Sequence, residues 1–222
     1  MRKMIYLGAV ALVLLAVSCT PSSNYNTGVP SQPLMPLAAG DQWIYLDSVF
    51  NNDNGGALDT IYIDTMVINN QTVAYNGPNG NITFYGVTDP NGWWGDTSYI
   101  GLDPSNTVLY GVDGLSGTPY AFFGTASSDG VILGQSTDYT TNPNCATQYT
   151  LIGYATPVKV GSYTCLWNQQ QAVNCNNFTV ETINTYVDPG VGVVRIVDYE
   201  ADSTGANLNL SFSMTLQSFK AN

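Results

Sequence analysis

Apolar and polar residues alternate along most of this 222-residue chain with a period of two. The clearest case is the run from 208 to 216, in which every even-numbered position is apolar. Because successive side chains of a strand point to opposite faces, this run predicts a strand with one face in a core. After residue 18, no stretch keeps an apolar period of 3.6 residues over three turns, so the pattern predicts no helix there.

Other short runs are enriched in β-branched and aromatic residues, as strands are. These runs are 43–46, 61–66, 107–110, 148–152 and 191–197. Clusters of Gly, Pro, Asn and Asp separate them, at 54–56, 76–80, 89–92, 113–114 and 188–190. The pattern predicts an all-β fold, either an antiparallel, strongly curved sheet or an incomplete β-barrel, with the first and last strands adjacent or nearly so. By length, residues 41–222 form a single β-rich domain.

The N-terminal residues follow a different pattern. Arg2 and Lys3 give a positive start, an apolar run covers 4–17, and Cys19 lies just beyond it. The run is too short for a comfortable membrane span and is typical of an export signal, so we expect residues 1–18 to be a cleaved signal helix. The segment resembles a bacterial lipoprotein signal, which implies that Cys19 is acylated and becomes the mature N-terminus.

One position departs from the lipoprotein pattern, which usually has Leu three residues before the cysteine. This chain has Ala16 there, and the small residues at 16–18 also fit an ordinary signal-peptide site. Both routes cut after Ser18 and differ in whether Cys19 carries lipid. The alternative to a lipoprotein is therefore a freely secreted protein.

Residues 19–40 are expected to form a flexible, disordered tether. They are rich in Pro, Ser, Asn and Gly, and they carry no charged side chain. Such a composition does not bury enough apolar surface to fold alone. The tether would lift the folded domain off a membrane.

The chain is acidic, with 5 Lys and Arg against 16 Asp and Glu and a net charge of −11. Cleavage of the signal would remove Arg2 and Lys3 and no acid, which makes the mature protein more negative still. This charge excludes a nucleic-acid partner and argues against docking on anionic lipid by charge. The expected partner is a membrane, reached through the acyl chains on Cys19. Each CH₂ group of these chains that is buried in the bilayer contributes about 0.8 kcal/mol to membrane binding.

Three cysteines remain besides Cys19. A hairpin with its turn centred near Gln170 would place Cys165 and Cys175 opposite each other, and facing cysteines of this kind can form a disulfide. Cys145 and Cys175 both lie in Asn-rich loops and are the rival pair. The spacing does not form a Cys-x-x-Cys redox motif, so we expect a structural role.

The chain contains no His, which excludes His-based catalytic triads and most metal enzymes. Paired carboxylates remain, but the chain has only two glutamates, Glu181 and Glu200, and nothing in the sequence places them together in a cleft. Fragments similar to calcium loops begin at Asp53 and Asp89, and neither has the later Glu that an EF-hand needs. We expect no catalytic residue, no metal site and no cofactor, and a carboxylate-dependent hydrolase is the last alternative.

Trp93 and Trp94 are adjacent and lie between two glycines. Neighbouring residues of a strand point to opposite faces, so one tryptophan would be in the core and the other would form a platform. Asp89, Asn91 and Asp96 would surround that platform, which suits stacking on a sugar or a peptide. A tryptophan that packs over a barrel mouth is the structural alternative.

Two parts of the domain carry a family resemblance. Residues 40–45 read Gly-Asp-Gln-Trp-Ile-Tyr, residues 158–165 read Val-Lys-Val-Gly-Ser-Tyr-Thr-Cys, and residues 185–194 read Thr-Tyr-Val-Asp-Pro-Gly-Val-Gly-Val-Val. These segments resemble an uncharacterised family of Bacteroidetes lipoproteins with a Gly-x-x-Trp-x-Tyr opening and a Pro-Gly-Val-Gly closing motif. The resemblance implies an incomplete antiparallel β-barrel, similar to LolA-type lipoprotein carriers, in a fold that can hold acyl chains. It leaves residues 70–145 unmatched.

Gly192 lies inside the closing strand run, after the turn signal at 188–190. A missing side chain in a strand marks a bulge or a close approach of another segment. We expect a structural role for this glycine, and the alternative is that it lines a ligand path.

The leading interpretation is a lipid-anchored protein of the bacterial cell envelope with a non-catalytic binding or structural role. Its curved sheet would hold a hydrophobic or acyl ligand, with Trp43 and Tyr45 near one end. The rival is a glycan or peptide ligand on Trp93 and Trp94. Some Bacteroidetes lipoproteins, which this chain resembles, carry an acidic run just after the cysteine as a surface-export signal, and no such run follows Cys19. The resemblance therefore favours the periplasmic face of the outer membrane over the cell surface and leaves both faces open.

Overall fold

The computed structural model describes residues 30–77, 80–89, 98–113, 118–139 and 145–222. Within these ranges the elements are β1 (Gln42–Asn51), the short 3₁₀ helix η1 (Asn52–Asn54), β2 (Ala57–Gly77), β3 (Gly80–Thr88), β4 (Ser98–Leu102), β5 (Val108–Asp113), β6 (Tyr120–Gly124), β7 (Val131–Asp138), β8 (Thr147–Val160), β9 (Tyr163–Val173), β10 (Thr179–Asp188), β11 (Gly192–Ala201) and β12 (Leu208–Lys220). No helix in this described part is long and apolar enough to cross a bilayer. The prediction of an all-β fold is confirmed.

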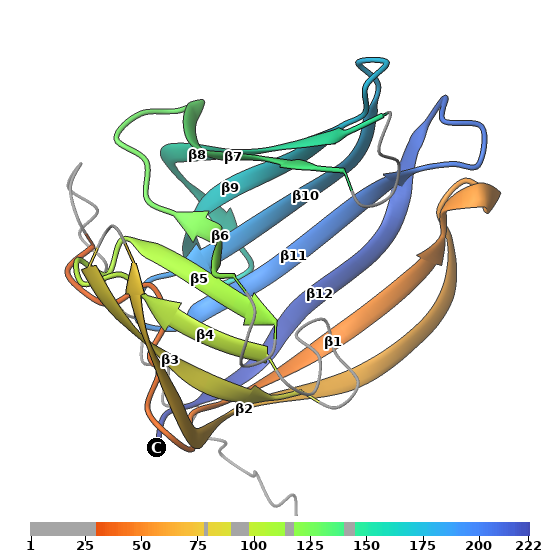
Figure 1. Cartoon of the computed structure of the whole chain (residues 1–222). Coiled ribbons are helices and arrows are strands. Elements are labelled where there is room, and N and C mark those ends of the chain that lie inside the picture. Colours follow the sequence, from red (N-terminus) through yellow and green to blue (C-terminus); the bar gives the residue numbers. More distant parts are fainter. Residues whose placement is uncertain (1–29, 78–79, 90–97, 114–117, 140–144) are drawn as a thin grey trace, which may run out of the picture.

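All twelve strands belong to one sheet, in the order β6-β5-β4-β3-β2-β1-β12-β11-β10-β9-β8-β7. Every neighbouring pair is antiparallel. The sheet curves almost into a closed barrel (Figure 1), and one seam remains between β6 and β7, which do not pair. β1 pairs with β12, so the first and last strands are adjacent and the predicted incomplete β-barrel is confirmed.

The two ends of the barrel differ. The turns β1–β2, β9–β10 and β11–β12 all project from one end, at the right and top of Figure 1. We call this end the hairpin rim. The N-terminal segment that precedes β1 and the C-terminus lie at the opposite end.

β1 shows how the period-two pattern builds the inner face. Trp43, Tyr45 and Asp47 are buried, and the residues between them are partly exposed. The Trp43 Nε1–H donates to the carbonyl oxygen of Val191 at 2.7 Å, and the Tyr45 hydroxyl donates to the carbonyl oxygen of Val193 at 3.1 Å. The opening strand is thus tied to β11 and to the turn that precedes it.

One hydrophobic core lines the inner face away from the hairpin rim. Its buried members are Leu34, Met35, Trp43, Tyr45, Met66, Ile68, Val87, Ile100, Leu109, Phe122, Phe123, Cys165, Val187, Val193, Val194, Ile196, Met214 and Leu216. Most of them lie in the strand halves farther from the rim hairpins. The rim half of the inner face carries the polar groups described below.

The N-terminal segment corrects one prediction. Residues 19–40 were expected to form a disordered tether; residues 19–29 lie outside the described residues, and within 30–40 Leu34 and Met35 are fully buried in the core. Gly192 has φ +108°, and a Cβ on it would lie 2.8 Å from the Met35 Cγ. The missing side chain of Gly192 therefore makes room for Met35, so this glycine marks a close approach within the core.

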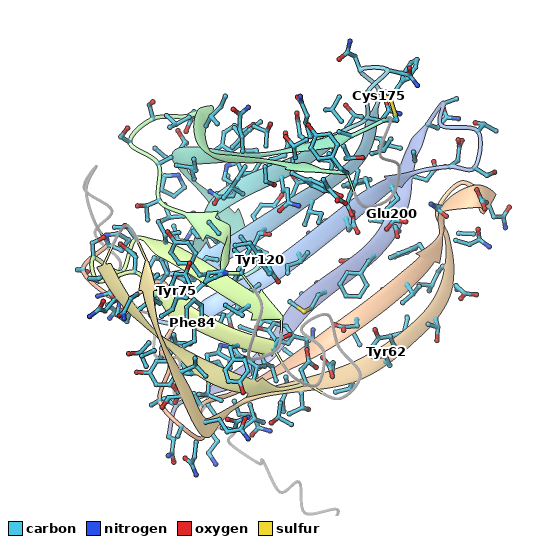
Figure 2. All side chains as sticks on the ribbon, viewed as in Figure 1. Tyr62, Tyr75, Phe84, Tyr120, Cys175 and Glu200 are labelled. Carbon is cyan, nitrogen blue, oxygen red and sulfur yellow. A yellow bond between two sulfur atoms is a disulfide. The ribbon has the colours of Figure 1, made fainter. Side chains whose placement is uncertain are left out.

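A smaller cluster packs on strands β3 to β5. Its buried members are Ile82, Phe84, Tyr99 and Val112. Tyr75 on β2 meets Phe84 edge-on, with ring centroids 6.3 Å apart (Figure 2). A Cβ on Gly101 would lie 3.0 Å from the Phe84 ring, so the ring covers a glycine of the neighbouring strand.

Cys145 and Cys175 form a disulfide, with Cα atoms 5.0 Å apart, and Cys165 is buried and free. The prediction of a Cys165–Cys175 pair is therefore wrong, and the rival pair is the one formed. The residues expected to turn near Gln170 continue as β9, so Cys165 lies near the start of that strand and Cys175 lies beyond its end. Cys145 precedes β8, whose first residues pair with the last residues of β9, and this register brings it beside Cys175.

Candidate functional site

A side chain of β9 bridges the seam next to β6. Asn168 on β9 is 1% exposed, and its Oδ1 accepts from the Gly124 N–H at 2.7 Å. Its Nδ2 donates to the Gly124 carbonyl oxygen at 3.0 Å. The Asn168 amide thus makes the two hydrogen bonds that a neighbouring strand would make to Gly124, the last residue of β6. Without them the N–H and the carbonyl oxygen of Gly124 would be buried without a partner.

Beyond this bridge the seam opens into a cavity of about 410 Å³, which we call the seam cavity. Its lining comes from β6 to β9 and the residue before β6: Pro119, Tyr120, Ala121, Gly134, Gln135, Ser136, Tyr149, Leu151 and Gln170. Tyr120 is labelled in Figure 2. The volume lies within the range of small-ligand pockets, roughly 300–1,000 Å³. The cavity therefore has the size of a binding site at the place where the sheet is not closed.

A second hollow, of about 530 Å³, lies where the N-terminal segment crosses β3 and β4. Asp103 contributes to its lining, and the Asp103 carboxylate accepts hydrogen bonds from the N–H groups of Thr107 and Val108. Hydrogen bonds from Ser105, Val108 and Thr107 lower the pKa of Asp103 against the opposing effect of burial. Its charged group is thus used to hold a turn.

A cross-strand row leads from the seam cavity toward the acidic part of the inner face. Tyr149 pairs with Ala172, Ala172 with Glu181, and Glu181 with Glu200. Burial raises the pKa of Tyr149, and the charges of Glu181 and Asp138 raise it further. The small side chain of Ala172 lies between the tyrosine and the first glutamate, so the cavity and the acids share one continuous surface.

Three carboxylates meet near the hairpin rim, and we call them the carboxylate trio: Glu181, Asp198 and Glu200. One oxygen from each lies within 4.8 Å of the others. Burial raises the pKa of Asp198 to about 7, with further contributions from Glu181 and Glu200. Burial and the charge of Glu200 also raise the pKa of Glu181. The trio is therefore electrostatically costly when all three groups are ionised.

Two further acids, Asp47 and Asp64, lie on the inner face of β1 and β2. They are 0% and 1% exposed, and no carboxylate oxygen of either one has a hydrogen-bond partner. Asp47 pairs with Tyr62 and Asp64 with Tyr45 (Tyr62 is labelled in Figure 2). Burial raises the pKa of Asp47 to about 7, and the charge of Asp64 contributes. The interior of the barrel is thus acidic on two of its walls.

Trp43 and Tyr45, the residues expected near one end of a ligand site, belong to the core. Both are fully buried, and their polar atoms bond to backbone carbonyls. The Trp43 ring stacks on Phe219, with centroids 5.0 Å apart. Neither residue lines the seam cavity.

The other predicted site residues have different outcomes. Trp93, Trp94 and Cys19 lie outside the described residues. The Asp53 carboxylate accepts from the Ser203 N–H at 2.6 Å, so this acid joins two rim turns. Burial raises the pKa of the free Cys165 thiol to about 12, which makes a redox role unfavourable.

An aromatic row crosses the sheet on β8, β9 and β10. The rings of Tyr154 and Trp167 stack at 3.7 Å with 4° between their planes, and Tyr186 lies 6.1 Å from Trp167. The Trp167 ring lies between the other two, in the arrangement of stacked aromatic side chains on neighbouring strands. We interpret this row as cross-strand packing.

Asn168 and Asp198 were not predicted as site residues, and the expectation that nothing places Glu181 and Glu200 together is wrong, since both belong to the carboxylate trio. A signal for the trio was available, since counting outward from the turn at 188–190 places Glu181 close to Glu200 on the facing strand. A register shift between Tyr186 and Val187 sets the final pairing. No sequence signal marks Asn168, because its partner on β6 depends on how far the whole sheet curves.

No family model matches the chain, and no curated protein matches it. Two solved structures are similar in fold. One is a protein from Bacteroides fragilis NCTC 9343 assigned as exported and YmcC-like in fold, with 14% identity, a TM-score of 0.40, and coverage of 86% of this chain and 100% of that one. The other is a protein from Parabacteroides distasonis ATCC 8503 assigned as a lipoprotein, with 14% identity, a TM-score of 0.43, and coverage of 85% and 99%. At these scores neither likeness carries an argument about function.

Proposed function

We propose that this protein is a lipid-anchored binding protein of the bacterial cell envelope that holds an acyl chain in the seam cavity. The observation that carries the proposal is a cavity of about 410 Å³ between strands that do not pair. The role is non-catalytic.

The position of the cavity suits a long apolar ligand. Entry from the side through an unpaired seam breaks no β-ladder hydrogen bonds, whereas entry through a closed wall would. Tyr149 and Leu151 give the cavity an apolar wall, and Gln135, Ser136 and Gln170 supply polar groups for one end of a ligand. Each buried CH₂ of an acyl chain would contribute about 0.8 kcal/mol to binding.

The proposed anchor is the acylated Cys19, which would hold the barrel close to a lipid surface. The location that follows is the outer membrane, with the periplasmic face favoured. The acidic composition fits this arrangement, since it provides no basic patch for direct docking on anionic lipid.

Native mass spectrometry tests the proposed ligand. A Cys19→Ser variant is exported without an acyl anchor and purified without detergent, so any bound lipid is a ligand. We expect extra mass that matches a fatty acid or a phospholipid and that disappears on denaturation. A clean apo mass would contradict the proposal, and glycan and peptide screens with Trp93 and Trp94 changed to Ala would then test the rival ligand.

A second variant locates the ligand. A Cβ on Gly134 would meet nothing within 4 Å, so Gly134→Phe fills the seam cavity without a backbone clash. We expect Gly134→Phe to lose the bound mass. Ile132→Phe is the matched control, because Ile132 lies on the same strand, is 59% exposed and does not line the cavity. Equal lipid content in the two variants would place the ligand elsewhere.

A further inference from the structure

We propose that Glu181, Asp198 and Glu200 bind one calcium ion near the hairpin rim, inside the barrel. This site does not depend on the proposed acyl ligand.

The backbone register places the three carboxylates together. Glu181 on β10 pairs directly with Glu200 on β11, and Ile183 pairs with Asp198. Asp198 and Glu200 are two apart on one strand, so both lie on the face that Glu181 occupies on the neighbouring strand. One oxygen from each carboxylate lies within 4.8 Å of the other two. An ion between these oxygens would need only small side-chain rotations to reach the 2.3–2.6 Å distances of calcium coordination.

Asp198 gives an independent indication of a missing ligand. Its side chain is 7% exposed and brings one carboxylate oxygen into the trio, and its Oδ1 is buried with no hydrogen-bond partner. A buried carboxylate oxygen without a partner carries a large desolvation cost, and buried charges in proteins are normally paired or coordinate a metal. A cation at this position would remove that cost.

No protein cation of the described residues takes this role. Their basic side chains are Lys159, Arg195 and Lys220. Arg195 is exposed and acts on Tyr186, whereas every contribution to the pKa of Asp198 comes from burial or from a carboxylate and raises it. The neutral Asn52 amide donates to the Glu200 Oε2 at 3.5 Å, but among the described residues no positively charged side chain contributes to the pKa of Asp198, so the trio can carry up to three negative charges.

The chemistry of the donors selects the metal. All three side chains offer oxygen, and the chain has no His, so the site suits a hard cation. Calcium accepts several carboxylates in flexible geometry, whereas magnesium keeps most of its waters and is rarely held by protein groups alone. Glu181 and Glu200 are only partly buried, which leaves a path for the ion from the rim.

Isothermal titration calorimetry on the full-length protein, freed of metal with EDTA and dialysed, tests the site. We expect calcium to bind saturably with one ion per chain. At a calcium concentration of about 100 times Kd, the melting temperature should rise by about 5 °C or more. The absence of saturable calcium binding would overturn the proposal, and magnesium binding of equal affinity would overturn the assignment to calcium.

Two variants connect the binding to these residues. Asp198→Asn keeps the shape of the side chain and removes its charge, so we expect the calcium affinity to fall about tenfold or more. Glu200→Gln, at a less buried position, should weaken binding in the same direction and serves if Asp198→Asn folds poorly. Asp59→Asn is the matched control, because Asp59 is exposed on β2 and should leave the affinity unchanged. Equal affinity in all three variants would exclude the trio.

Discussion

At the scale of single residues, Asp47 has the clearest energetic consequence. It is fully buried with no hydrogen-bond partner, and its pKa is raised from 3.8 to about 7. Because the folded state binds the proton more tightly than the unfolded state, ionisation of Asp47 destabilises the fold. This part of the stability is present at low pH and is lost as the pH rises from about 4 to 7.

We therefore expect the free energy of unfolding of the metal-free protein to fall between pH 5 and pH 8. Asp47 alone accounts for roughly 2–3 kcal/mol of this fall. Asp47→Asn should remove this part of the pH-dependent fall in the free energy of unfolding, and the part that comes from Asp198 should remain. Urea unfolding at the two pH values in EDTA measures the change, and Asp59→Asn should keep the wild-type slope. An unchanged slope in Asp47→Asn would show that this group titrates normally.

Gly192 provides a second prediction at this scale. Its φ is +108°, and a Cβ would press on the Met35 Cγ at 2.8 Å. We expect Gly192→Ala to destabilise the protein by about 1–3 kcal/mol through backbone strain and overpacking. Thermal unfolding measures the loss. Gly134→Ala is the control, since its Cβ meets nothing within 4 Å and its φ is not positive, and it should differ little from the wild type.

At the scale of the elements, the seam depends on the bridge between Asn168 and Gly124. Asn168→Ala would leave the N–H and the carbonyl oxygen of Gly124 without their partner. We expect a loss of about 1–3 kcal/mol and faster hydrogen exchange at the Gly124 amide. Asn184→Ala removes the same side chain from the next strand, where the amide accepts one bond from Gln169, and should cost less. An equal loss of stability in the two variants would contradict a specific role of the Asn168–Gly124 bridge in holding β6 at the seam.

The strands were largely predictable, and their register was not. The alternating residues at 208–216 and the opening run at 43–46 form β12 and β1 as expected, because burial of one sheet face imposes a period of two. Local pattern failed at 165–175, where a polar Gln-rich stretch suggested a turn and the structure continues as β9. Those polar side chains are accommodated because the Gln171 Nε2 donates to the Gln169 Oε1, and the Gln169 Nε2 donates to the Asn184 Oδ1.

At the scale of the whole molecule, the Cys145–Cys175 disulfide joins two neighbouring hairpins near the rim. It closes a segment with a sequence separation of 30 residues. We expect the double variant Cys145→Ser, Cys175→Ser to lose roughly 3–4 kcal/mol, on a chain-entropy estimate for a loop of this length. Urea unfolding measures the loss, and peptide mapping without reductant checks the pairing. A Cys165-containing disulfide in that map would contradict the structure.

The candidate sites follow from the whole sheet, which explains why the sequence did not reveal them. The seam cavity exists because β6 and β7 end the strand order, and that order involves contacts between residues far apart in the chain. Tyr120 and Leu151 have no shared local motif that would place them together. The carboxylate trio required only one hairpin and was closer to prediction from the sequence.

The pairing of β1 with β12 has a consequence for how the barrel assembles. Gln42 faces Lys220, so the ladder between the two halves of the sheet, β1–β6 and β7–β12, joins residues from nearly opposite ends of the chain. Contacts of such sequence separation form slowly, because a long loop must close before they contribute. Each half can form its own hairpins early, but the barrel cannot close before the last strand has emerged. A chain that stops short of β12 would leave two separate half-sheets with exposed edges, open to self-association.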